Sequence, residues 1–401
     1  MIKNRSEILF IYDVRDCNPN GDPGSDEPNY PRIDESDGKC WVSDLRLKRT
    51  IRDYLHNYLG EEIFFREILL PDGTLGTRES IWDAYNGNLF DVLKSCIDIR
   101  CFGGVFPLSK KKEAKDDKDK KTKAKKKEKE QQIESKSLFN GDNEIFETTE
   151  NATEEKEASA AIAVQPKTNF HLTGPIQFAW GKTYHAVEVI RHEGTSVLPS
   201  KENKMQGTIT TSYKIPYGLI GFYGVVNENI VVKEHFRILK SYFSGQKTDE
   251  EIVSVLLSQK DLDKMLFSLW FGTKTLKTTS KMQSPRLLIQ IVYHEGNLDF
   301  IGDLDRKITI KITSPTYIAN RIDAERKIRN ISDVALQMDK LLYFIDTYAP
   351  LIKEIRLIQD KECVCLYCDE PVDISEYFKS KSIAVINLGD IFSQFSQKNS
   401  N

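Results

Sequence analysis

Apolar residues near the N-terminus form two contrasting patterns. Residues 7–14, EILFIYDV, are a continuous apolar and β-branched run, which is typical of a strand buried on both faces. Residues 42–60 place apolar side chains three and four positions apart, which predicts an amphipathic helix. Ser43 is a natural N-cap for this helix, and Gly60 can end it. We therefore expect a buried strand, a long polar loop and a capped helix.

Further along the chain, strand-like and helix-like segments interleave without an internal repeat or a regular βαβ spacing. This order favours an α+β fold over a doubly wound parallel sheet. The expected strands are 97–102, 175–180, 185–191, 217–226, 286–293, 307–313, 352–359 and 382–387, and the expected helices are 88–96, 231–243, 249–271 and 332–346.

A charged, low-complexity segment interrupts this pattern at 109–167. From Ser109 to Glu130 there are 12 lysines and 6 acidic residues, and from Gln131 to Lys167 there are 8 acidic residues and 3 lysines. Such a segment buries too little apolar surface to offset its ordering entropy, so we expect a largely disordered insertion. A basic run of this kind can bind RNA, but more often it is simply solvated. The insertion would separate residues 1–108 from residues 168–401.

Residues 193–216 are polar and contain glycine, and they precede an apolar strand. This composition predicts a hairpin or arm that stands off the sheet. Lys201, Lys204 and Lys214 make the arm basic. Met205, near its tip, is a candidate wedge for parting stacked bases, although a loop methionine can also simply pack on the surface.

Overall composition restricts where a nucleic acid could bind. The 401 residues carry a formal net charge of −3 and have a pI near 6.2, so a nucleic-acid site must lie on a local basic patch. No apolar run approaches the ~18 residues of a membrane span, and the charged N-terminus does not resemble a signal peptide. Seven cysteines at irregular spacing suggest reduced thiols. We expect a cytoplasmic protein that has no contact with membranes.

The helix at 42–60 provides one basic patch. Ser43 and the free N–H groups of the first helical turn can accept a phosphate, and arginine and lysine beside them suit a polyanion. An ordinary solvated helix face would have the same charges. The basic residues are Arg46, Lys48, Arg49 and Arg52, with Asp44 and Asp53 opposing them.

Residues 264–294 provide a second patch, because they contain five basic residues and no acidic residue. The central sequence GTKTLKTTSKMQSPR is small and rich in hydroxyls, which suits a loop that lies along phosphates without reading bases. The basic residues are Lys264, Lys274, Lys277, Lys281 and Arg286.

Residues 16–27, DCNPNGDPGSDE, match the template of a calcium loop. However, a buried strand rather than a helix precedes this stretch, and Pro23 lacks the N–H that pairs such loops. We interpret it as a turn-rich loop in which Gly21 and its neighbours serve backbone geometry.

No other metal or catalytic motif is complete. Cys363, Cys365 and Cys368 include one C-x-x-C, but zinc needs four ligands and no second pair follows. The neighbouring histidines His171, His185 and His192 have no adjacent nucleophile or base. We expect no metal and no cofactor.

Several stretches together resemble one family, and their order along the chain matches that family. They are NPNGDP (18–23), PRID (31–34), VSDLRLKRTIRDYL (42–55), DIRCFGG (98–104), LTGPIQFAWG (172–181) and YGLIGFYGVVN (217–227). The chain resembles the Cas7 family, the Cascade backbone subunit of type I CRISPR systems, in its subtype I-B form. The C-terminal third matches only loosely, through LLIQIVY (287–293), and the charged insertion departs from the family pattern.

The resemblance implies a modified RNA-recognition-motif (ferredoxin-like) palm with an inserted thumb hairpin. It implies a non-catalytic subunit that polymerises head-to-tail along the CRISPR RNA spacer and presents the guide to target DNA in antiviral defence. The implied partners are further copies of this chain, a 5′-handle-binding subunit, a repeat-processing endoribonuclease and a large PAM-reading subunit.

The expected RNA-binding residues include Asn18 and Arg32, which lie in the first two motifs of the resemblance. The full set is Asn18, Arg32, Ser43, Arg46, Lys48, Arg49, Arg52, Lys201, Lys204, Met205, Lys214, Lys274, Lys277, Lys281 and Arg286. Two alternatives stay open. One is a metal-dependent endoribonuclease of the related type III kind, with Asp16, Asp22 or Asp34 as the catalytic acid, and the other is a scaffold protein that binds no RNA.

Overall fold

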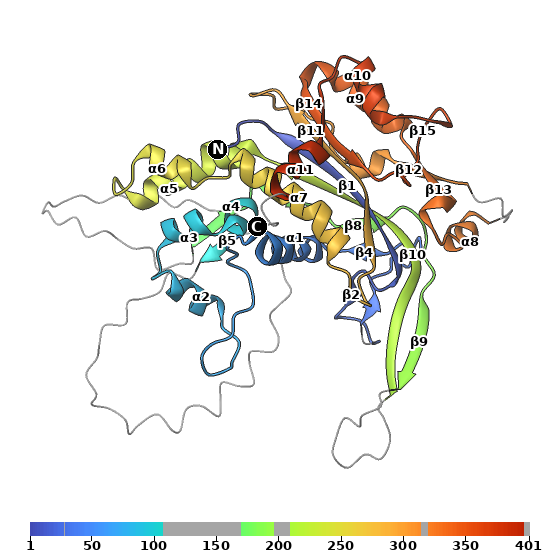
Figure 1. The fold of residues 1–401 in the computed structure, drawn as a ribbon, viewed down its shortest axis with the longest axis horizontal. Helices are drawn as coiled ribbons and strands as arrows, with labels where there is room; N and C mark the ends of the chain where they lie inside the picture. Colours follow the sequence, from blue (N-terminus) through green and yellow to red (C-terminus); the bar gives the residue numbers. More distant parts are fainter. Residues whose placement is uncertain (28, 107–169, 196–208, 314–319, 397–401) are drawn as a thin grey trace, which may run out of the picture. The chain divides into compact units, whose positions relative to one another are not determined.

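The computed structural model describes residues 1–27, 29–106, 170–195, 209–313 and 320–396 (Figure 1). The described residues within Met1–Phe106 and His171–Asn401 form one compact unit. The predicted disorder of the insertion lies outside the described residues, as do Lys201, Lys204 and Met205.

A nine-stranded sheet organises this unit, and its central strand is β1 (Ser6–Cys17). β1 is antiparallel to β10 (Ile209–Val226) on one side and to β11 (Gln283–Tyr293) on the other. The strand order is β17-β14-β11-β1-β10-β8-β4, and β7 and β9 also pair with β10. The remaining strands are β4 (Trp41–Val42), β7 (Ile176–Phe178), β8 (Gly181–Thr183), β9 (Ile190–Thr195), β14 (Ile352–Gln359) and β17 (Val385–Asn387).

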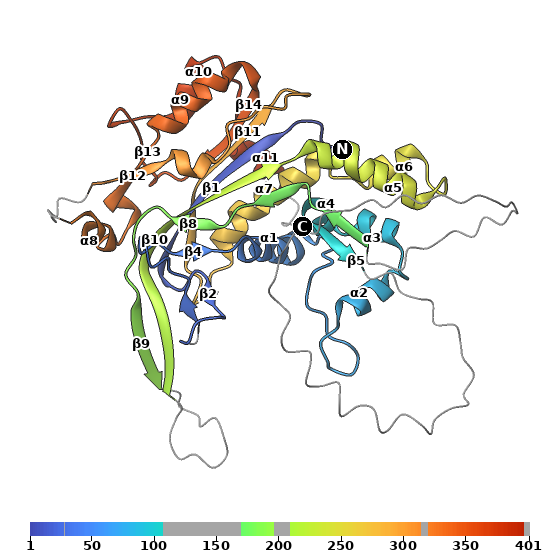
Figure 2. The ribbon, with the colours of Figure 1, turned by 180° about the vertical axis from the view of Figure 1, so that it is seen from behind.

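Strand β10 is longer than its partner β1 and takes part in two pairings. Cys17, at the end of β1, is opposite Ile215, and the pairing runs from there to Ser6 opposite Val226. Beyond this point, Lys214 is opposite Ile190, and the rest of β10 pairs with β9. Figures 1 and 2 show the β9–β10 hairpin leaving the sheet. The predicted arm is therefore a hairpin in its described part.

The two longest helices pack on each other beside this sheet. α1 (Asp44–Leu59) begins at the Ser43 N-cap and ends at Gly60, whose φ of 66° lies in the left-handed region, as predicted. α7 (Gln259–Thr275) contacts both α1 and β11. At their crossing, a Cβ on Gly272 would lie 3.1 Å from the carbonyl oxygen of Thr50, so the helices approach closely where the glycine stands.

The C-terminal part adds a second sheet in the order β12-β13-β15-β16. One hydrophobic core joins this sheet and helix α9 to the main sheet, and it includes Leu9, Ile289 and Leu336. The elements are β12 (Thr309–Ile312), β13 (Val334–Gln337), β15 (Cys365–Tyr367), β16 (Glu370–Pro371), α8 (Arg321–Arg326), α9 (Asp339–Tyr348), α10 (Ile374–Ser380) and α11 (Leu388–Ser396).

Shorter elements complete the described residues, which have a mixed α/β fold. They are β2 (Gly21–Asp22), β3 (Tyr30–Pro31), α2 (Arg78–Ala84), α3 (Leu89–Ser95), α4 (Ile97–Phe102), β5 (Gly103–Phe106), β6 (Phe170–Thr173), a π-helix (Ile230–His235), α5 (Phe236–Phe243), α6 (Asp249–Ser254) and 3-10 turns at Leu304–Lys307, Ile331–Asp333 and Ala349–Leu351.

Three sequence predictions of secondary structure are wrong. The expected strand at 97–102, IDIRCF, is helix α4, because the alternating Asp98 and Arg100 are ion-pair partners of Arg52 and Asp261 rather than the solvent face of a strand. The helix expected at 249–271 is two helices, since a capping box of Ser258 and Asp261 starts α7 anew. The helix expected at 332–346 begins with strand β13 before α9 starts.

The strand expected at 185–191 is displaced toward the hairpin, because β9 begins only at Ile190. His185 is buried instead. Its Nδ1 lies 2.9 Å from the Ala186 carbonyl oxygen, and its Nε2 accepts a 3.2 Å hydrogen bond from the Leu219 N–H. Burial lowers the pKa of His185 to about 4, so the ring is neutral and structural.

We predict that deleting residues 110–165 and bridging the gap with a short Gly/Ser linker leaves the thermal midpoint of unfolding unchanged within a few degrees. The flanks are fixed by each other, since a Cβ on Gly103 would lie 2.1 Å from the Leu172 carbonyl oxygen. The deleted segment offers little apolar surface to a core. Calorimetry of both proteins tests this, and a drop of many degrees would show that the segment packs.

Candidate nucleic-acid interface

The turn at 18–21, just beyond the end of β1, is the centre of the candidate site. The side chain of Asn18 donates to the Asn29 carbonyl (2.6 Å) and accepts from the Asn20 N–H (3.1 Å). The hydroxyl of Ser43 donates to the Asn20 side chain at 3.3 Å. The turn is therefore tied to the N-cap of α1, and these hydrogen bonds agree with a loop that serves backbone geometry.

The turn requires a glycine at position 21 because there is no room for a Cβ atom, and not because the backbone is left-handed. It is absent from the glycines with positive φ in the described residues. A Cβ at this position would lie 1.9 Å from the Asn29 Oδ1. A larger residue would therefore have to displace the asparagine side chain.

Cationic side chains from three separate elements converge on the turn. The ammonium of Lys281 donates to the Asn18 carbonyl. Arg32 donates its backbone N–H to the Asn20 carbonyl and its Nε to the Gly21 carbonyl, each at 3.3 Å. Arg46, in the first turn of α1, donates its backbone N–H to the Ser43 hydroxyl at 3.3 Å. Its guanidinium donates to the Thr50 hydroxyl at 2.8 Å and lies close enough to Lys281 to lower the pKa of that amine. The structure thus brings together five of the residues predicted for RNA binding: Asn18, Arg32, Ser43, Arg46 and Lys281.

These cations lack carboxylate partners. Among the described residues, no ion pair joins Arg32, Arg46 or Lys281 to an acidic side chain. Burial, and then the nearby Arg46 guanidinium, lower the pKa of Lys281 to about 8. Because both effects penalise the charged amine, an anion placed here would relieve the penalty. The arrangement fits a phosphate group.

The other basic residues of α1 are tied into the fold. Arg52 lies 3.0 Å from the buried carboxylate of Asp98, and Lys48 lies 2.9 Å from Asp44. Both cations also stand over the ring of Phe102. Their positive charge is therefore largely neutralised by contacts within the protein.

Arg49 and Arg286 also form ion pairs within the protein, but they differ in exposure. Arg49 is about half exposed and is paired with Asp53 at 2.7 Å. Arg286 is buried and reaches Asp13, Asp360 and Glu362 at 2.7–2.8 Å. Arg286 therefore neutralises acidic groups inside the protein rather than forming an open cationic surface.

The remaining predicted residues lie around this centre. Lys274, near the end of α7, and Lys277, just after it, are exposed, and the loop that follows leads to Lys281. Lys214 is half-buried where the β9–β10 hairpin leaves the sheet.

Sequence reasoning missed Trp180 as a member of the site. Its side chain is 46% exposed, and the Arg32 guanidinium carbon lies 5.1 Å from its ring centroid. Met282, next to Lys281, is 48% exposed. The sequence feature that could have identified Trp180 is a tryptophan directly before the glycine that begins a strand, in FAWGKTY. Cations interleaved with exposed apolar groups are typical of single-strand binding surfaces.

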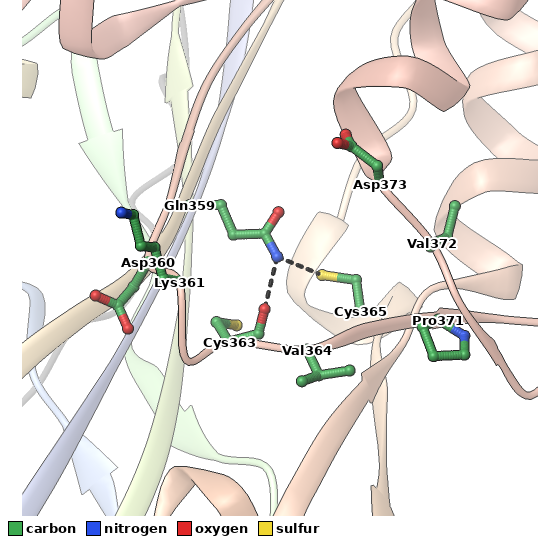
Figure 3. A pocket seen from close by; sticks show the side chains of 9 residues that line it. All are labelled: Gln359, Asp360, Lys361, Cys363, Val364, Cys365, Pro371, Val372 and Asp373. Carbon is green, nitrogen blue, oxygen red and sulfur yellow. Dashed lines mark hydrogen bonds between the residues drawn. The ribbon is translucent and has the colours of Figure 1, made fainter.

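Cys363 and Cys365 lie elsewhere, beside a hollow of about 440 Å³ (Figure 3), whereas Cys368 is exposed. The Gln359 amide donates to the Cys363 carbonyl at 2.6 Å and to the Cys365 sulfur at 3.6 Å. A hydrogen bond with Cys365, together with burial, raises the pKa of the Cys363 thiol, which disfavours the metal-binding thiolate. These contacts fit buried thiols at Cys363 and Cys365.

The acidic residues proposed for a nuclease have separate environments. Asp16 is exposed at a left-handed φ of 49°, and Asp22 accepts from the Gly24 N–H at 3.1 Å. Hydrogen bonds from Lys182 and Ser36 hold the pKa of Asp34 below its ordinary value. In the described part of the chain, no three His, Cys, Asp or Glu side chains are grouped to hold a metal ion.

A family model shows the relationship of the chain to known proteins. The model of CRISPR-associated protein Cas7 matches residues 4–121 and 108–339, which together are more than half of the chain. The chain belongs to the Cas7 family. A Cas7-family relative from Haloferax volcanii, "CRISPR-associated protein Cas7", is 27% identical over 393 residues, which are 97% of this chain and 96% of the relative.

Two solved structures resemble the Cas7-family chain at low TM-scores. A chain of "CRISPR RNA-guided surveillance complex, pre-nicking" has a TM-score of 0.42 and 12% identity, and covers 98% of this chain and 99% of that one. A chain of "CRISPR RNA-guided surveillance complex" has a TM-score of 0.39 and 13% identity, over 94% and 99%. The family assignment rests on the sequence matches. Within the described residues, no helix has the length and apolar character to span a membrane.

We predict that Asp98→Ala destabilises the protein by about 3–5 kcal/mol, because it strands a buried cation and two buried donors. Asp98 is fully buried and accepts from Arg52 and from the N–H groups of Phe64 and Phe65. Urea unfolding measures the change. The control Asp53→Ala removes an exposed pair and should cost about 1 kcal/mol or less. Equal effects would show that the Arg52 pair is no anchor.

Proposed function

We propose that this Cas7-family chain is the RNA-binding backbone subunit of a type I CRISPR surveillance complex (Cascade), in its subtype I-B form. Copies would stack head-to-tail along the CRISPR RNA spacer and hold the guide for pairing with target DNA. The other partners would be the subunits that bind the 5′ handle, process the repeat and read the PAM. In this proposal the chain is a cytoplasmic protein and cuts no nucleic acid.

The observation that carries the proposal is the cation set at the 18–21 turn. Lys48, Arg49, Arg52 and Arg286 each have a carboxylate partner. Arg32, Arg46 and Lys281, which meet at the turn, form no ion pair among the described residues. Leaving such groups unpaired and half-buried is costly unless a ligand supplies the negative charge. A phosphate backbone does so without reading base sequence.

The order of the strands supports an RNA-recognition-motif-like palm. β1, α1, β8, β10, α7 and β11 follow one another as βαββαβ, with other elements between them. The corresponding strands lie in the order β11-β1-β10-β8, and each adjacent pair is antiparallel. This is the ferredoxin-like arrangement. In it, the β9–β10 hairpin is a thumb inserted between the second and third strands, and 109–167 is an insertion between the first helix and the second strand.

We predict that the double variant Arg46→Ala/Lys281→Ala binds RNA of every sequence more weakly and with a flatter salt dependence. Each lost phosphate contact should lower the slope of log affinity against log salt by about 0.7 for a single strand. Fluorescence anisotropy with several unrelated RNAs measures this. The control Lys240→Ala/Lys379→Ala removes two exposed cations on α5 and α10 and should leave the slope unchanged.

Three results would contradict the proposal. If the Arg46/Lys281 double variant kept the wild-type RNA affinity and the wild-type salt dependence, the turn would not be the RNA-binding site. Sequence-specific cleavage of RNA by the wild-type protein in magnesium would instead support the endoribonuclease alternative. A wild-type protein that fails to retain RNA during purification would favour the scaffold.

We predict that RNA affinity is constant below about pH 7 and falls as the pH rises through about 8. In the proposed site the charged amine of Lys281 pairs with phosphate. Because the pKa of this amine in the free protein is about 8, the amine loses its charge, and with it the phosphate contact, as the pH rises above that value. In Lys281→Arg the guanidinium stays charged, so this fall should disappear. Binding titrations from about pH 6 to about pH 9 measure the difference. Identical pH profiles for both proteins would contradict the role of Lys281.

A further inference from the structure

Trp180 is an exposed aromatic side chain on a rigid backbone. The preceding residue, Ala179, donates its N–H to the Tyr223 carbonyl at 2.9 Å. The following residue, Gly181, packs so closely that a Cβ there would lie 2.3 Å from the Phe222 ring. Both neighbours are therefore held against strand β10, yet the indole between them remains 46% exposed.

The Arg32 guanidinium is part of the same platform. Its central carbon lies 5.1 Å from the Trp180 ring centroid, and its Nε donates to the Gly21 carbonyl. No carboxylate among the described residues pairs with it. An indole and a guanidinium held together present flat surfaces on which a nucleobase can stack.

The platform is continuous with the cationic site, because both are built on the 18–21 turn. Arg32 is bonded to Gly21, and Lys281 is bonded to Asn18. A nucleic-acid strand whose phosphate lies at Lys281 and Arg46 would carry its bases past the same turn. The charge and the exposed ring therefore fit one ligand.

We propose that Trp180, together with Arg32, is a stacking site for one unpaired base of single-stranded RNA. The inference rests on the proposed RNA-binding function and adds a contact to the base, which the phosphate site does not provide. Stacking would be tolerant of sequence, because every base has a π-face.

Trp41 provides an internal contrast. The Lys182 ammonium lies 4.4 Å from its ring centroid, but Lys182 is also paired with Asp34 and Asp37 at 2.8 Å each. These carboxylates neutralise the cation and repel a phosphate. Trp41 is only partly exposed and is therefore a matched control rather than a second site.

The test combines two readouts on the full chain, with an oligouridylate as the probe. The first is tryptophan fluorescence. RNA should quench it in the wild type and in Trp41→Phe, and Trp180→Phe should abolish most of the quenching while RNA still binds. Trp82 and Trp270 are buried and contribute little to the change.

The second readout separates stacking from charge. Trp180→Ala should weaken RNA binding by about 5- to 100-fold at every salt concentration, without changing the salt slope. An abasic oligomer of the same length should bind wild type and Trp180→Ala equally. The exposed-aromatic control Tyr343→Ala, on α9, should behave as wild type. Circular dichroism and thermal unfolding confirm that each variant is folded.

Several outcomes would overturn the stacking site while leaving the proposed function intact. They are unchanged quenching in Trp180→Phe, unchanged affinity in folded Trp180→Ala, and a loss of self-association in that variant with normal RNA binding. The last outcome would make Trp180 a contact between copies. A wild-type protein that binds no RNA would overturn the proposed function and the stacking site together.

Discussion

The pairing of β1 with β10 is the constraint on which the rest of the structure depends. β1 is antiparallel to β10 along one edge and to β11 along the other, and residues 8–11 have no exposed surface. Because β10 continues beyond the end of β1, one strand belongs both to the sheet and to the hairpin with β9. Where β1 ends at Cys17, the chain turns away at 18–21. The turn and the hairpin base are therefore fixed at the same end of one strand pair.

This geometry divides the basic residues into two groups. Cations such as Arg52 and Arg286 neutralise buried carboxylates and would leave them unpaired if removed. The cations at the turn have no such partner in the described residues, and burial and then repulsion from Arg46 lower the pKa of Lys281. Arginine and lysine side chains thus contribute to the stability of the fold and, in our proposal, to RNA binding. In our proposal only their partners distinguish the two roles, and the turn is one place in the described residues where positive charge has no carboxylate partner.

Sequence patterns predicted the elements whose signals are local. The buried strand at 7–14, the caps of α1 at Ser43 and Gly60, and the arm all follow from neighbouring residues. The same patterns failed at 97–102, because the alternation of apolar residues with Asp98 and Arg100 is typical of a strand, whereas both charged groups are partners in long-range ion pairs. The family was also accessible from the sequence, since its motifs are contiguous, and so was the region that we propose binds phosphate.

The sequence could not show which basic residues pair with carboxylates of the protein and which do not. The partner of Arg52 is Asp98, which lies 46 residues away on another helix, and the partner of Arg286 is Asp13, 273 residues away. Trp180 was missed for a related reason, since its exposure and its stacking on Arg32 depend on strands that are distant in sequence. Charge counts identify basic segments, but long-range pairing decides which charges remain for a ligand.

Ultraviolet crosslinking of the full chain to bound RNA, followed by mass spectrometry of the crosslinked peptides, tests the central claim most directly. The account predicts crosslinks in the peptides that contain the 18–21 turn, the start of α1, Trp180 and residues 274–282. Crosslinks confined to other surfaces, such as α9 and α10, with none at the turn, would contradict it.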